Sequence, residues 1–306
     1  MKEIIRTRSL NKTYKDVCAV SDNNISVNKG EIYGFLGLNG AGKTTTIRML
    51  LGIVKPTSGQ ALLYDSLVVP SNTNIWKKTG YLVEVPHSYP NLSVKENLHL
   101  IRKLRNLEDR KVVDRIMEKL EITSYANRLA KHLSLGNKQR LGLAKAMMHD
   151  PEIMILDEPT NGLDPAGIHD IRELLIDLAK NKGVTIFISS HILGEISQFA
   201  TRIGIIHKGK MIREIYSDQL KELCHKQLVI QTNNDNEALE VIHRHGLMET
   251  MIQNNQIVSM DKKTVVAPDE IARLLISNNF KLNKLNVEEE NLESFFLRTI
   301  KEKEAI

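Results

Sequence analysis

Short apolar runs alternate with helical patterns through the first 220 residues of the chain. Three mostly apolar runs are expected to be strands buried on both faces: 31–36, 152–156 and 184–189. A helix is expected at 42–51, after a glycine-rich turn, and another at 164–180. Asp164 is a favoured capping residue and Pro165 suits the first helical position, which supports that start. The alternation of strand and helix predicts an α/β core with a parallel sheet.

Two regions depart from this alternation. The stretch 93–148 is mostly helical in pattern and lacks a strand-like run, so we expect a helical subdomain at about 85–150 inserted into the core. After about Leu220 the order becomes strand, helix, strand, strand, helix, strand, which predicts a small α+β unit of ferredoxin-like type. The expected strands are 228–230, 248–252, 257–260 and 280–285, and the expected helices are 237–245, 268–277 and a last one at 290–303. We therefore expect a domain at 1–220 and an accessory domain at 221–306.

The composition is that of a globular protein, with 306 residues, 42% apolar and 26% charged. It excludes a disordered chain and collagen, and no apolar run approaches the ~18–20 residues that a spanning helix needs. The N-terminal residues resemble no signal peptide, and we expect a cytosolic protein. Cys18 and Cys224 are too few for a disulfide framework and are expected to be small buried apolar residues.

The positive charge is unevenly distributed. The whole chain carries +5, but 219–306 contains 11 Lys and Arg against 14 Asp and Glu, so that 1–218 carries +8. This excess suits either an ordinary solvated surface or a partner rich in phosphate, and both remain open. Because no long Lys/Arg run or aromatic–basic interleaving occurs, we expect no nucleic-acid partner.

Residues 37–44 read G-L-N-G-A-G-K-T and fit the phosphate-loop pattern G-x-x-x-x-G-K-[ST]. The glycines allow backbone N–H groups to close around phosphate oxygens, and the helix that follows directs its positive end at the same anion. Lys43 is expected to reach the β- and γ-phosphates of ATP and the Thr44 hydroxyl to ligate Mg²⁺. The expected nucleotide-binding residues here are Gly37, Leu38, Asn39, Gly40, Ala41, Gly42, Lys43, Thr44 and Thr45.

A second candidate lies at the end of the apolar run before Asp157 and Glu158. One carboxylate at such a strand end can hold Mg²⁺, and the next can polarise an attacking water. Two solvated acids would have the same pattern, but the phosphate loop in the same chain favours the chemical interpretation.

With these motifs together, residues 2–220 resemble the ATPase subunits of ATP-binding cassette (ABC) transporters. The resemblance is carried by the phosphate loop, by 133–140 (L-S-L-G-N-K-Q-R, the signature), by Asp157-Glu158, by 161–164 (N-G-L-D, the D-loop), by Ser190-His191, and by Tyr14 at 23 positions before Gly37. The order and the spacing of six motifs make the match specific.

The resemblance implies a role for each matched residue. Tyr14 would stack on adenine, Glu158 would be the general base, and His191 would bond the γ-phosphate. The signature residues Ser134, Gly136 and Asn137, with Asp164 of the D-loop, would meet the nucleotide held by a second copy of the chain. Two ATP molecules would then lie in a head-to-tail dimer. A serine hydroxyl and a glycine amide at a helix start also form an anion site on physical grounds.

The chain departs from the common family pattern at a few positions. Glu84 replaces a glutamine and is expected to ligate the metal with Thr44 and Asp157, while Leu135 and Asn137 replace a glycine and a glutamine of the signature. These departures, and the Glu-Val-Pro at 84–86, resemble the ATPases of bacitracin-resistance and lantibiotic-immunity exporters.

The expected function is therefore ATP hydrolysis that drives a separate transmembrane permease from the cytoplasmic face of the membrane. The stretch 84–106 is the expected docking surface for that permease. An exporter of another substrate, an ATP sensor without hydrolysis and a soluble family member that acts on ribosomes or DNA are the alternatives. Glu158 and His191 disfavour the sensor, and the single phosphate loop disfavours the last class, in which two cassettes often share one chain.

Overall fold

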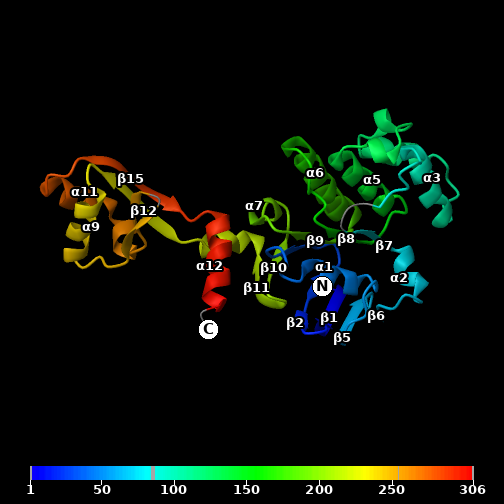
Figure 1. Ribbon diagram of the computed structural model, residues 1–306, viewed down its shortest axis with the longest axis horizontal. Helices are drawn as coiled ribbons and strands as arrows, with labels where there is room; N and C mark the ends of the chain where they lie inside the picture. Colours follow the sequence, from blue (N-terminus) through cyan, green and yellow to red (C-terminus); the bar gives the residue numbers. More distant parts are fainter. Residues whose placement is uncertain (1, 84–86, 254, 305–306) are drawn as a thin grey trace. The chain divides into compact units, whose positions relative to one another are not determined.

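The computed structural model describes residues 2–83, 87–253 and 255–304 of the chain. The chain divides into two compact units, Met1–Asp218 and Gln219–Ile306, which are described separately (Figure 1).

The first unit contains a six-stranded sheet, and its strands lie in the order β11 (Lys210–Tyr216), β10 (Arg202–His207), β4 (Ile32–Leu36), β9 (Thr185–Ser190), β8 (Ile153–Asp157) and β7 (Thr79–Leu82). All neighbours from β10 to β7 pair in parallel, and β11 is antiparallel to β10. Every residue of β4, β8 and β9 is buried, because helices or a second sheet cover both faces. The parallel sheet and its three predicted strands are confirmed.

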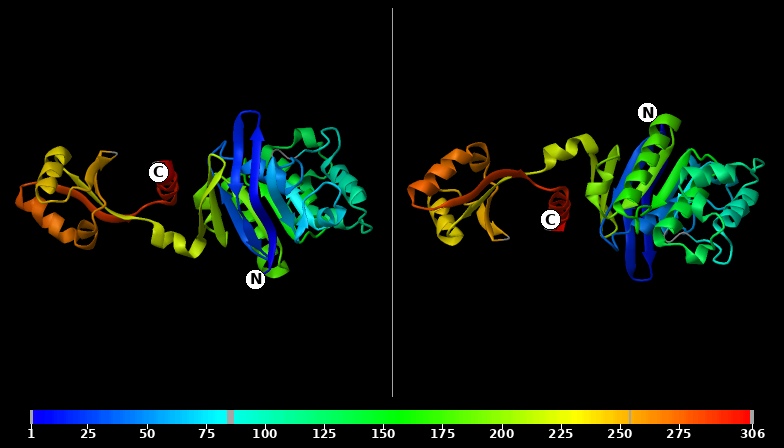
Figure 2. Two further views of the ribbon diagram at one scale, coloured as in Figure 1. Left: turned by 90° about the horizontal axis from the view of Figure 1, so that it is seen from below. Right: turned by 90° about the horizontal axis from the view of Figure 1, so that it is seen from above.

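A second, antiparallel sheet was not apparent from the sequence. It consists of β1 (Glu3–Tyr14), β2 (Val17–Asn23), β3 (Ser26–Asn28), β5 (Ser58–Leu63) and β6 (Ser66–Leu67). Figure 2 shows β1 and β2, in dark blue, as a hairpin beside the first sheet. Helix α1 (Lys43–Leu50) contacts strands of both sheets.

One cluster of buried side chains in this unit is contributed by both sheets and α1. The rings of Tyr33 and Phe187 stack with centroids 5.5 Å apart, and Phe35 lies 5.2 Å from Phe187 on the other side. Ile47 and Leu50 of α1 are fully buried in the same cluster. Each fully buried side chain of this kind contributes roughly 1.5–3 kcal/mol, so the loop before α1 rests on a rigid base.

The helices of the first unit agree with the predicted insertion. The helices are α2 (Thr73–Lys77), α3 (Val94–Leu104), α4 (Val112–Lys119), α5 (Leu135–Met147), α6 (Pro165–Lys182) and α7 (Leu193–Ile196), with 3-10 turns at Thr123–Tyr125 and Ala130–His132. Helices α3, α4 and α5 gather at one side of the unit (Figures 1 and 2). Ser93 and Glu96 form a capping box at the start of α3. Asp164 caps α6 and Pro165 opens it, as predicted, and Gly183 ends it with a φ of 66°.

The second unit follows the predicted succession of strands and helices. Its elements are α8 (Leu220–Leu223), β12 (Lys226–Thr232), α9 (Asp235–Arg244), β13 (Thr250–Gln253), β14 (Gln256–Ser259), α10 (Lys262–Val266), α11 (Pro268–Ser277), β15 (Leu282–Glu289) and α12 (Leu292–Glu304), after a 3-10 turn at Ser217–Gln219. The strand order is β13-β14-β12-β15, and every neighbouring pair is antiparallel. Leu228, Ile230 and Ile257 of the sheet pack against Ile242 of α9 and Leu275 of α11. The short helices α8 and α10 were not predicted.

The expectation of two buried cysteines is wrong for Cys18. Its side chain is exposed, while Cys224 is only partly buried. Cys18 lies on β2, which is the edge strand of its sheet, so one side of the strand remains open to solvent. No helix in the described ranges is both long and apolar enough to cross a bilayer.

Candidate nucleotide-binding site

The predicted chemical residues converge because three of their strands are neighbours. Strands β4, β9 and β8 lie side by side in parallel, so their carboxyl ends meet at one edge of the sheet. The phosphate loop follows β4, Glu158 follows β8, and His191 follows β9. This edge is where open α/β sheets bind ligands.

The phosphate loop leads directly into the N-terminus of α1. Gly42 occupies the N-cap position with a φ of 108°, and among the described residues no side chain caps this end. A Cβ at Gly42 would lie 2.6 Å from the carbonyl oxygen of Ala19, so only glycine fits. The backbone N–H groups at the helix start are therefore available to an anion.

Lys43 places its ammonium group at the centre of the site. The side chain is only 6% exposed, and its Nζ donates a hydrogen bond to the carbonyl oxygen of Gly37 at 2.6 Å. The same Nζ lies 3.2 Å from Oε1 of Glu158. The loop thus holds a cation beside the uncapped helix end, which suits a polyphosphate.

Asp157 lies beneath the loop and is almost fully buried. The Ser189 hydroxyl donates to its Oδ1 at 2.6 Å, and the Thr44 hydroxyl is also hydrogen-bonded to this carboxylate. Burial raises the pKa of Asp157 above its ordinary value, while the two hydroxyl groups and Lys43 oppose the increase. A hydroxyl and a carboxylate oxygen in contact are ligands that Mg²⁺ accepts, so the residues fit the ion. Glu84, the third predicted ligand, lies outside the described residues.

Glu158 and His191 form the other side of the site. The Nδ1 of His191 lies 2.7 Å from Oε2 of Glu158. The backbone of Glu158 has a φ of 49°, a value that is uncommon for a residue with a Cβ. The N–H of Glu158 donates to the Ser189 hydroxyl at 3.0 Å. Ser189 was not predicted as a site residue, although it holds the backbone of one acid and the side chain of the other.

A cleft of about 470 Å³ joins these groups. It is lined by Ala19, Leu38, Asn39, Gly40, Ala41, Gly42, Lys43, Thr44, Thr45, Glu158, Asn161 and His191. All but Ala19 and Asn161 were predicted as site residues. Asn161 belongs to the quoted D-loop, whereas Ala19 enters through its backbone beside Gly42 and has no recognisable signal in the sequence.

The remaining predicted residues lie away from this lining. Tyr14, at the end of β1, is 43% exposed, and the ammonium group of Lys12 lies 4.9 Å from its ring centroid. The Ser134 hydroxyl caps α5 by accepting from the N–H of Asn137 at 3.3 Å. The Asp164 carboxylate caps α6 by accepting from a backbone N–H at 3.0 Å.

The signature and the D-loop of the same chain are in contact. A Cβ at Gly162 would lie 2.2 Å from Cδ2 of Leu135, and one at Gly136 would lie 3.1 Å from Cδ2 of Leu163. Leu135, the residue that departs from the family pattern, therefore covers Gly162. The start of α5 and the loop after Glu158 form one packed surface.

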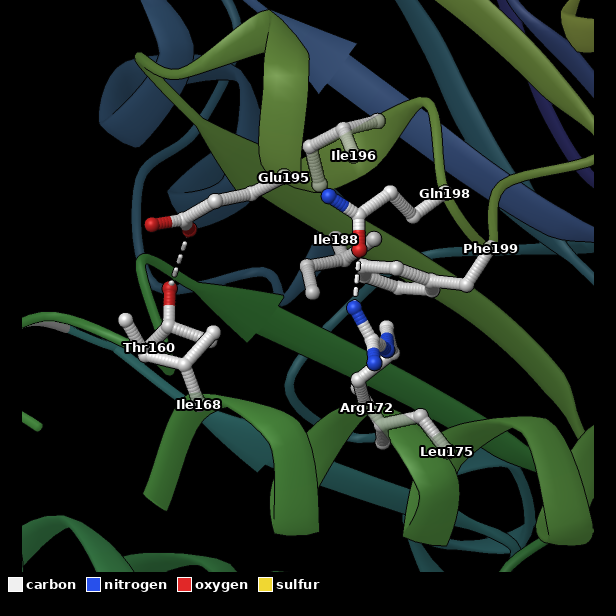
Figure 3. Close-up of a pocket in the computed structure, with 9 residues that line it drawn as sticks. All are labelled: Thr160, Ile168, Arg172, Leu175, Ile188, Glu195, Ile196, Gln198 and Phe199. Carbon is white, nitrogen blue, oxygen red and sulfur yellow. Dashed lines mark hydrogen bonds between the residues drawn. The ribbon is translucent and has the colours of Figure 1, made fainter. Parts of the chain in front are cut away.

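A second, much smaller cavity of about 60 Å³ lies between α6, β9 and α7 (Figure 3). The Thr160 hydroxyl donates to Oε2 of Glu195 at 3.1 Å, and Arg172 donates to Gln198 at the other end of the cavity (Figure 3). The cavity is too small for a nucleotide. Its lining includes Thr160, from the segment after Glu158, and Glu195 and Ile196 of α7, the helix that follows His191.

Comparison with known proteins agrees with this geometry. Residues 20–161 match the family model for ABC transporters. The chain is 41% identical to a bacitracin transport ATP-binding protein, BcrA, of Bacillus licheniformis, over 98% of each chain. It is 36% identical to a lantibiotic transport ATP-binding protein, SrtF, of Streptococcus pyogenes, over 74% of this chain and 99% of the relative.

Solved structures resemble most of the chain. A dimeric ATP-binding cassette in a post-hydrolysis state with ADP and Pi has a TM-score of 0.66 and 25% identity, and it covers 70% of this chain and 99% of its own. CbiO1 of Clostridium perfringens, part of an ABC transporter complex, has a TM-score of 0.63 and 25% identity, over 81% of this chain and 98% of its own. The extent of the match to full-length relatives, together with the site at the sheet edge, shows that the chain belongs to the family of ABC transporter ATP-binding proteins.

Proposed function

We propose that two copies of this ATPase bind two Mg·ATP between them and drive a separate transmembrane permease that exports a peptide antibiotic, bacitracin or a lantibiotic. The observation that carries the proposal is the meeting of Lys43, the Thr44–Asp157 pair and the Glu158–His191 pair at one end of α1. Cation, metal ligands and base are thus arranged around a single anion site.

Each group has a specific task in phosphoryl transfer to water. Lys43 and the N–H groups of α1 bind the β- and γ-phosphates, and Thr44 and Asp157 would hold Mg²⁺, which offsets phosphate charge when bound. Glu158 accepts the proton of the attacking water, and His191 bonds the γ-phosphate and orients Glu158. Glu84 is proposed as a further metal ligand from its sequence position alone.

The dimer is proposed because the signature lies outside the chain's own cleft. Ser134, Gly136 and Asn137 begin α5, and Asp164 begins α6, but none of them lines the cleft beside Lys43. In a head-to-tail pair these residues would close the cleft of the other copy, while Tyr14 would stack on adenine in its own. The dimeric cassette among the similar structures is consistent with this arrangement.

The two units are assigned as a nucleotide-binding domain at 1–220, with a helical subdomain at about 85–150, and an accessory domain at 221–306. The strand order β13-β14-β12-β15, with antiparallel neighbours, supports a ferredoxin-like fold for the accessory domain. The permease would dock on 84–106, which places the ATPase at the cytoplasmic face of the membrane. We propose no nucleic-acid partner.

Bacitracin or a lantibiotic is proposed as the cargo because the relatives that match this chain over nearly their whole length include proteins named for the transport of those substrates. An exporter of another substrate remains the second candidate, since the ATPase site does not contact cargo. A soluble member of the family without a permease is the third.

The test is to express the chain with the membrane subunits encoded beside it in a sensitive host. Growth is measured across bacitracin, a lantibiotic and an unrelated drug, with a Glu158→Gln chain as the inactive control. Resistance to one of the peptide antibiotics that disappears with Glu158→Gln is the expected result. Copurification with ribosomes, without a membrane partner, would contradict the proposal.

A further inference from the structure

We propose that Gln139 of the signature helix α5 is a positioning residue for Glu158. It holds the backbone of the general base from the helix whose first residues serve the other nucleotide of the dimer. The inference rests on the proposed roles of Glu158 and of the signature. It makes Gln139 a mechanical link between the two nucleotide sites.

The link is a direct hydrogen bond inside the protein. Gln139 is 4% exposed, and its Nε2 donates to the carbonyl oxygen of Glu158 at 3.2 Å. The N–H of Asn161 donates to the same oxygen at 3.1 Å and closes a tight turn over 158–161. One carbonyl group therefore fixes both the base and the start of the D-loop, and Gln139 is the part of that arrangement contributed by α5.

The conformation of Glu158 requires such support. Its φ of 49° lies in the left-handed region, where a Cβ is crowded, and residues persist there only when their surroundings hold them. Ser189 of β9 accepts from the N–H of Glu158 at 3.0 Å. The peptide groups on either side of the base are thus held by different elements, the N–H by β9 and the C=O by α5.

The acceptor oxygen of the Gln139 side chain supports the same role. Its Oε1 is buried and has no hydrogen-bond partner within the described part of the chain. Burying an amide with an unmet acceptor is unfavourable, and an apolar side chain of equal length would avoid that. Compared with an apolar side chain, the amide of Gln139 adds one hydrogen bond, which it donates to the carbonyl oxygen of Glu158.

The helix is well placed to transmit a displacement. Gln139 lies about one turn beyond Ser134, Leu135 and Gly136, which are proposed to meet the partner's nucleotide. Arg140 ties the same turn to Leu120 and to Asp170 of α6 at 3.2 and 2.9 Å. When the start of α5 engages phosphate across the dimer, Gln139 carries that shift to the Glu158 backbone.

The test compares Gln139→Met, which keeps length and removes the donor, with Asn283→Leu in the second unit, which removes an amide donor to the carbonyl oxygen of Thr232 at 3.3 Å. Because a misplacement of about 1 Å in a catalytic group costs up to ~100-fold, we expect Gln139→Met to lower kcat at least ~10-fold. The Kd for ATP should hardly change. Asn283→Leu should lower the melting temperature but keep kcat near the wild-type value. If Gln139→Met does not fold, Gln139→Asn, whose amide is too short to reach, replaces it.

A double-mutant cycle with Glu158→Ala separates positioning from a general structural effect. In single-turnover hydrolysis, Gln139→Met should not reduce the residual rate of the Glu158→Ala chain, because the group that it positions is absent. Wild-type kcat in Gln139→Met, or an equal reduction in both backgrounds, would overturn the inference. Wild-type hydrolysis by Glu158→Ala alone would instead overturn the proposed function.

Discussion

Lys43 and Glu158 face each other across the cleft, with Nζ and Oε1 3.2 Å apart. Both side chains are largely shielded from solvent, so their attraction is stronger than that of a surface pair. A triphosphate offers Lys43 more negative charge than one carboxylate does. In the proposed function, nucleotide binding would therefore replace Glu158 as the partner of Lys43, and Glu158 would then contact His191 and the attacking water.

Replacing Lys43 by alanine should weaken ATP binding and abolish turnover. The loss of a charge-assisted hydrogen bond costs ~1.5–3 kcal/mol, which corresponds to roughly 10- to 100-fold in Kd. Isothermal titration and a phosphate-release assay measure the two effects. Lys180→Ala, on an exposed turn of α6, is the control. Normal hydrolysis by the purified Lys43→Ala chain would exclude the assigned role.

Replacing Glu158 by glutamine should stop hydrolysis but preserve binding. An amide keeps the shape of the side chain but cannot accept the proton, so the rate should fall by ~10²–10⁴-fold. Lys43 also loses its ion pair, so ATP affinity should not decrease. Size-exclusion chromatography with Mg·ATP should show more dimer than the wild type. Glu152→Gln, just before β8, is the matched control, and a mutant at position 158 that stays monomeric with bound ATP would contradict the sandwich.

The residues predicted from motifs are those that act through their own chemistry. Lys43, Thr44, Glu158 and His191 are recognisable because each follows a strand and carries a reactive group. Ser189 lies inside strand β9, near its end, and its role depends on Asp157 and Glu158 at the end of the neighbouring strand β8, 32 and 31 residues away. Contacts between elements of this kind leave no pattern along the chain.

At the scale of elements, the three strands of the first unit that are buried on both faces were predictable, and the half-exposed strands of its antiparallel sheet were not. Strands β4, β8 and β9 read as continuous apolar runs because both of their faces are covered. Strand β1 should alternate, but Ile4 and Ile5 are both buried, Arg8 and Ser9 are both exposed, and its register with β2 shifts near Lys12. The antiparallel sheet that completes the core was therefore missed.

The end of α5 contains a pH-sensitive contact. The Nε2 of His149 lies 3.1 Å from the carbonyl oxygen of Thr79, at the start of β7. Burial, and secondly the nearby Arg105, lower the pKa of His149 from 6.5 to about 4. The folded protein thus prefers neutral His149, so the contribution to stability is complete above pH 6.5 and is lost as the pH falls toward 4.

Between pH 7 and 5 this contact should cost ~1 kcal/mol of unfolding free energy, after a discount for the partial exposure of the ring. Urea denaturation at both pH values measures it. His149→Gln keeps a donor for Thr79 but does not titrate, so its stability should depend less on pH by that amount. Equal pH dependence in the two chains would show that folding does not shift the pKa of His149.

At the scale of the whole molecule, the division into two units was visible in the pattern. The expected change near residue 220 is close to the boundary between Asp218 and Gln219. Two changes in the sequence mark this boundary. The alternation of strands and helices gives way to a short α+β succession, and the net charge changes from +8 before the boundary to −3 after it. The sequence gives no comparable indication of the function of the second unit. Its described residues contain no cluster of metal-binding side chains, and we recognise no catalytic or binding motif in its sequence.

The segment 87–93 belongs to the proposed docking surface, and two helices hold it. Lys145 of α5 donates to the carbonyl oxygen of His87 at 2.9 Å and to the Ser88 hydroxyl at 2.7 Å. Asn97 of α3 is almost fully buried, accepts from the N–H of Tyr89 at 2.9 Å and donates to its carbonyl at 3.1 Å. Its amide also reaches the carbonyl oxygens of two further residues of the segment.

Asn97→Ala should therefore loosen the docking surface without touching the phosphate site. Losing these buried bonds costs roughly 1–3 kcal/mol, a local loss that the folded chain tolerates. We expect the isolated ATPase to keep nearly wild-type turnover while drug resistance in cells falls sharply, because motion at the nucleotide no longer reaches the permease. Minimal inhibitory concentration and phosphate release are measured for the same variants at matched expression. Asn181→Ala, which removes one exposed hydrogen bond on α6, is the matched control and should leave both readouts unchanged. Parallel losses of ATPase activity and resistance in Asn97→Ala would mean that the segment supports the catalytic site itself, and the docking role would be withdrawn.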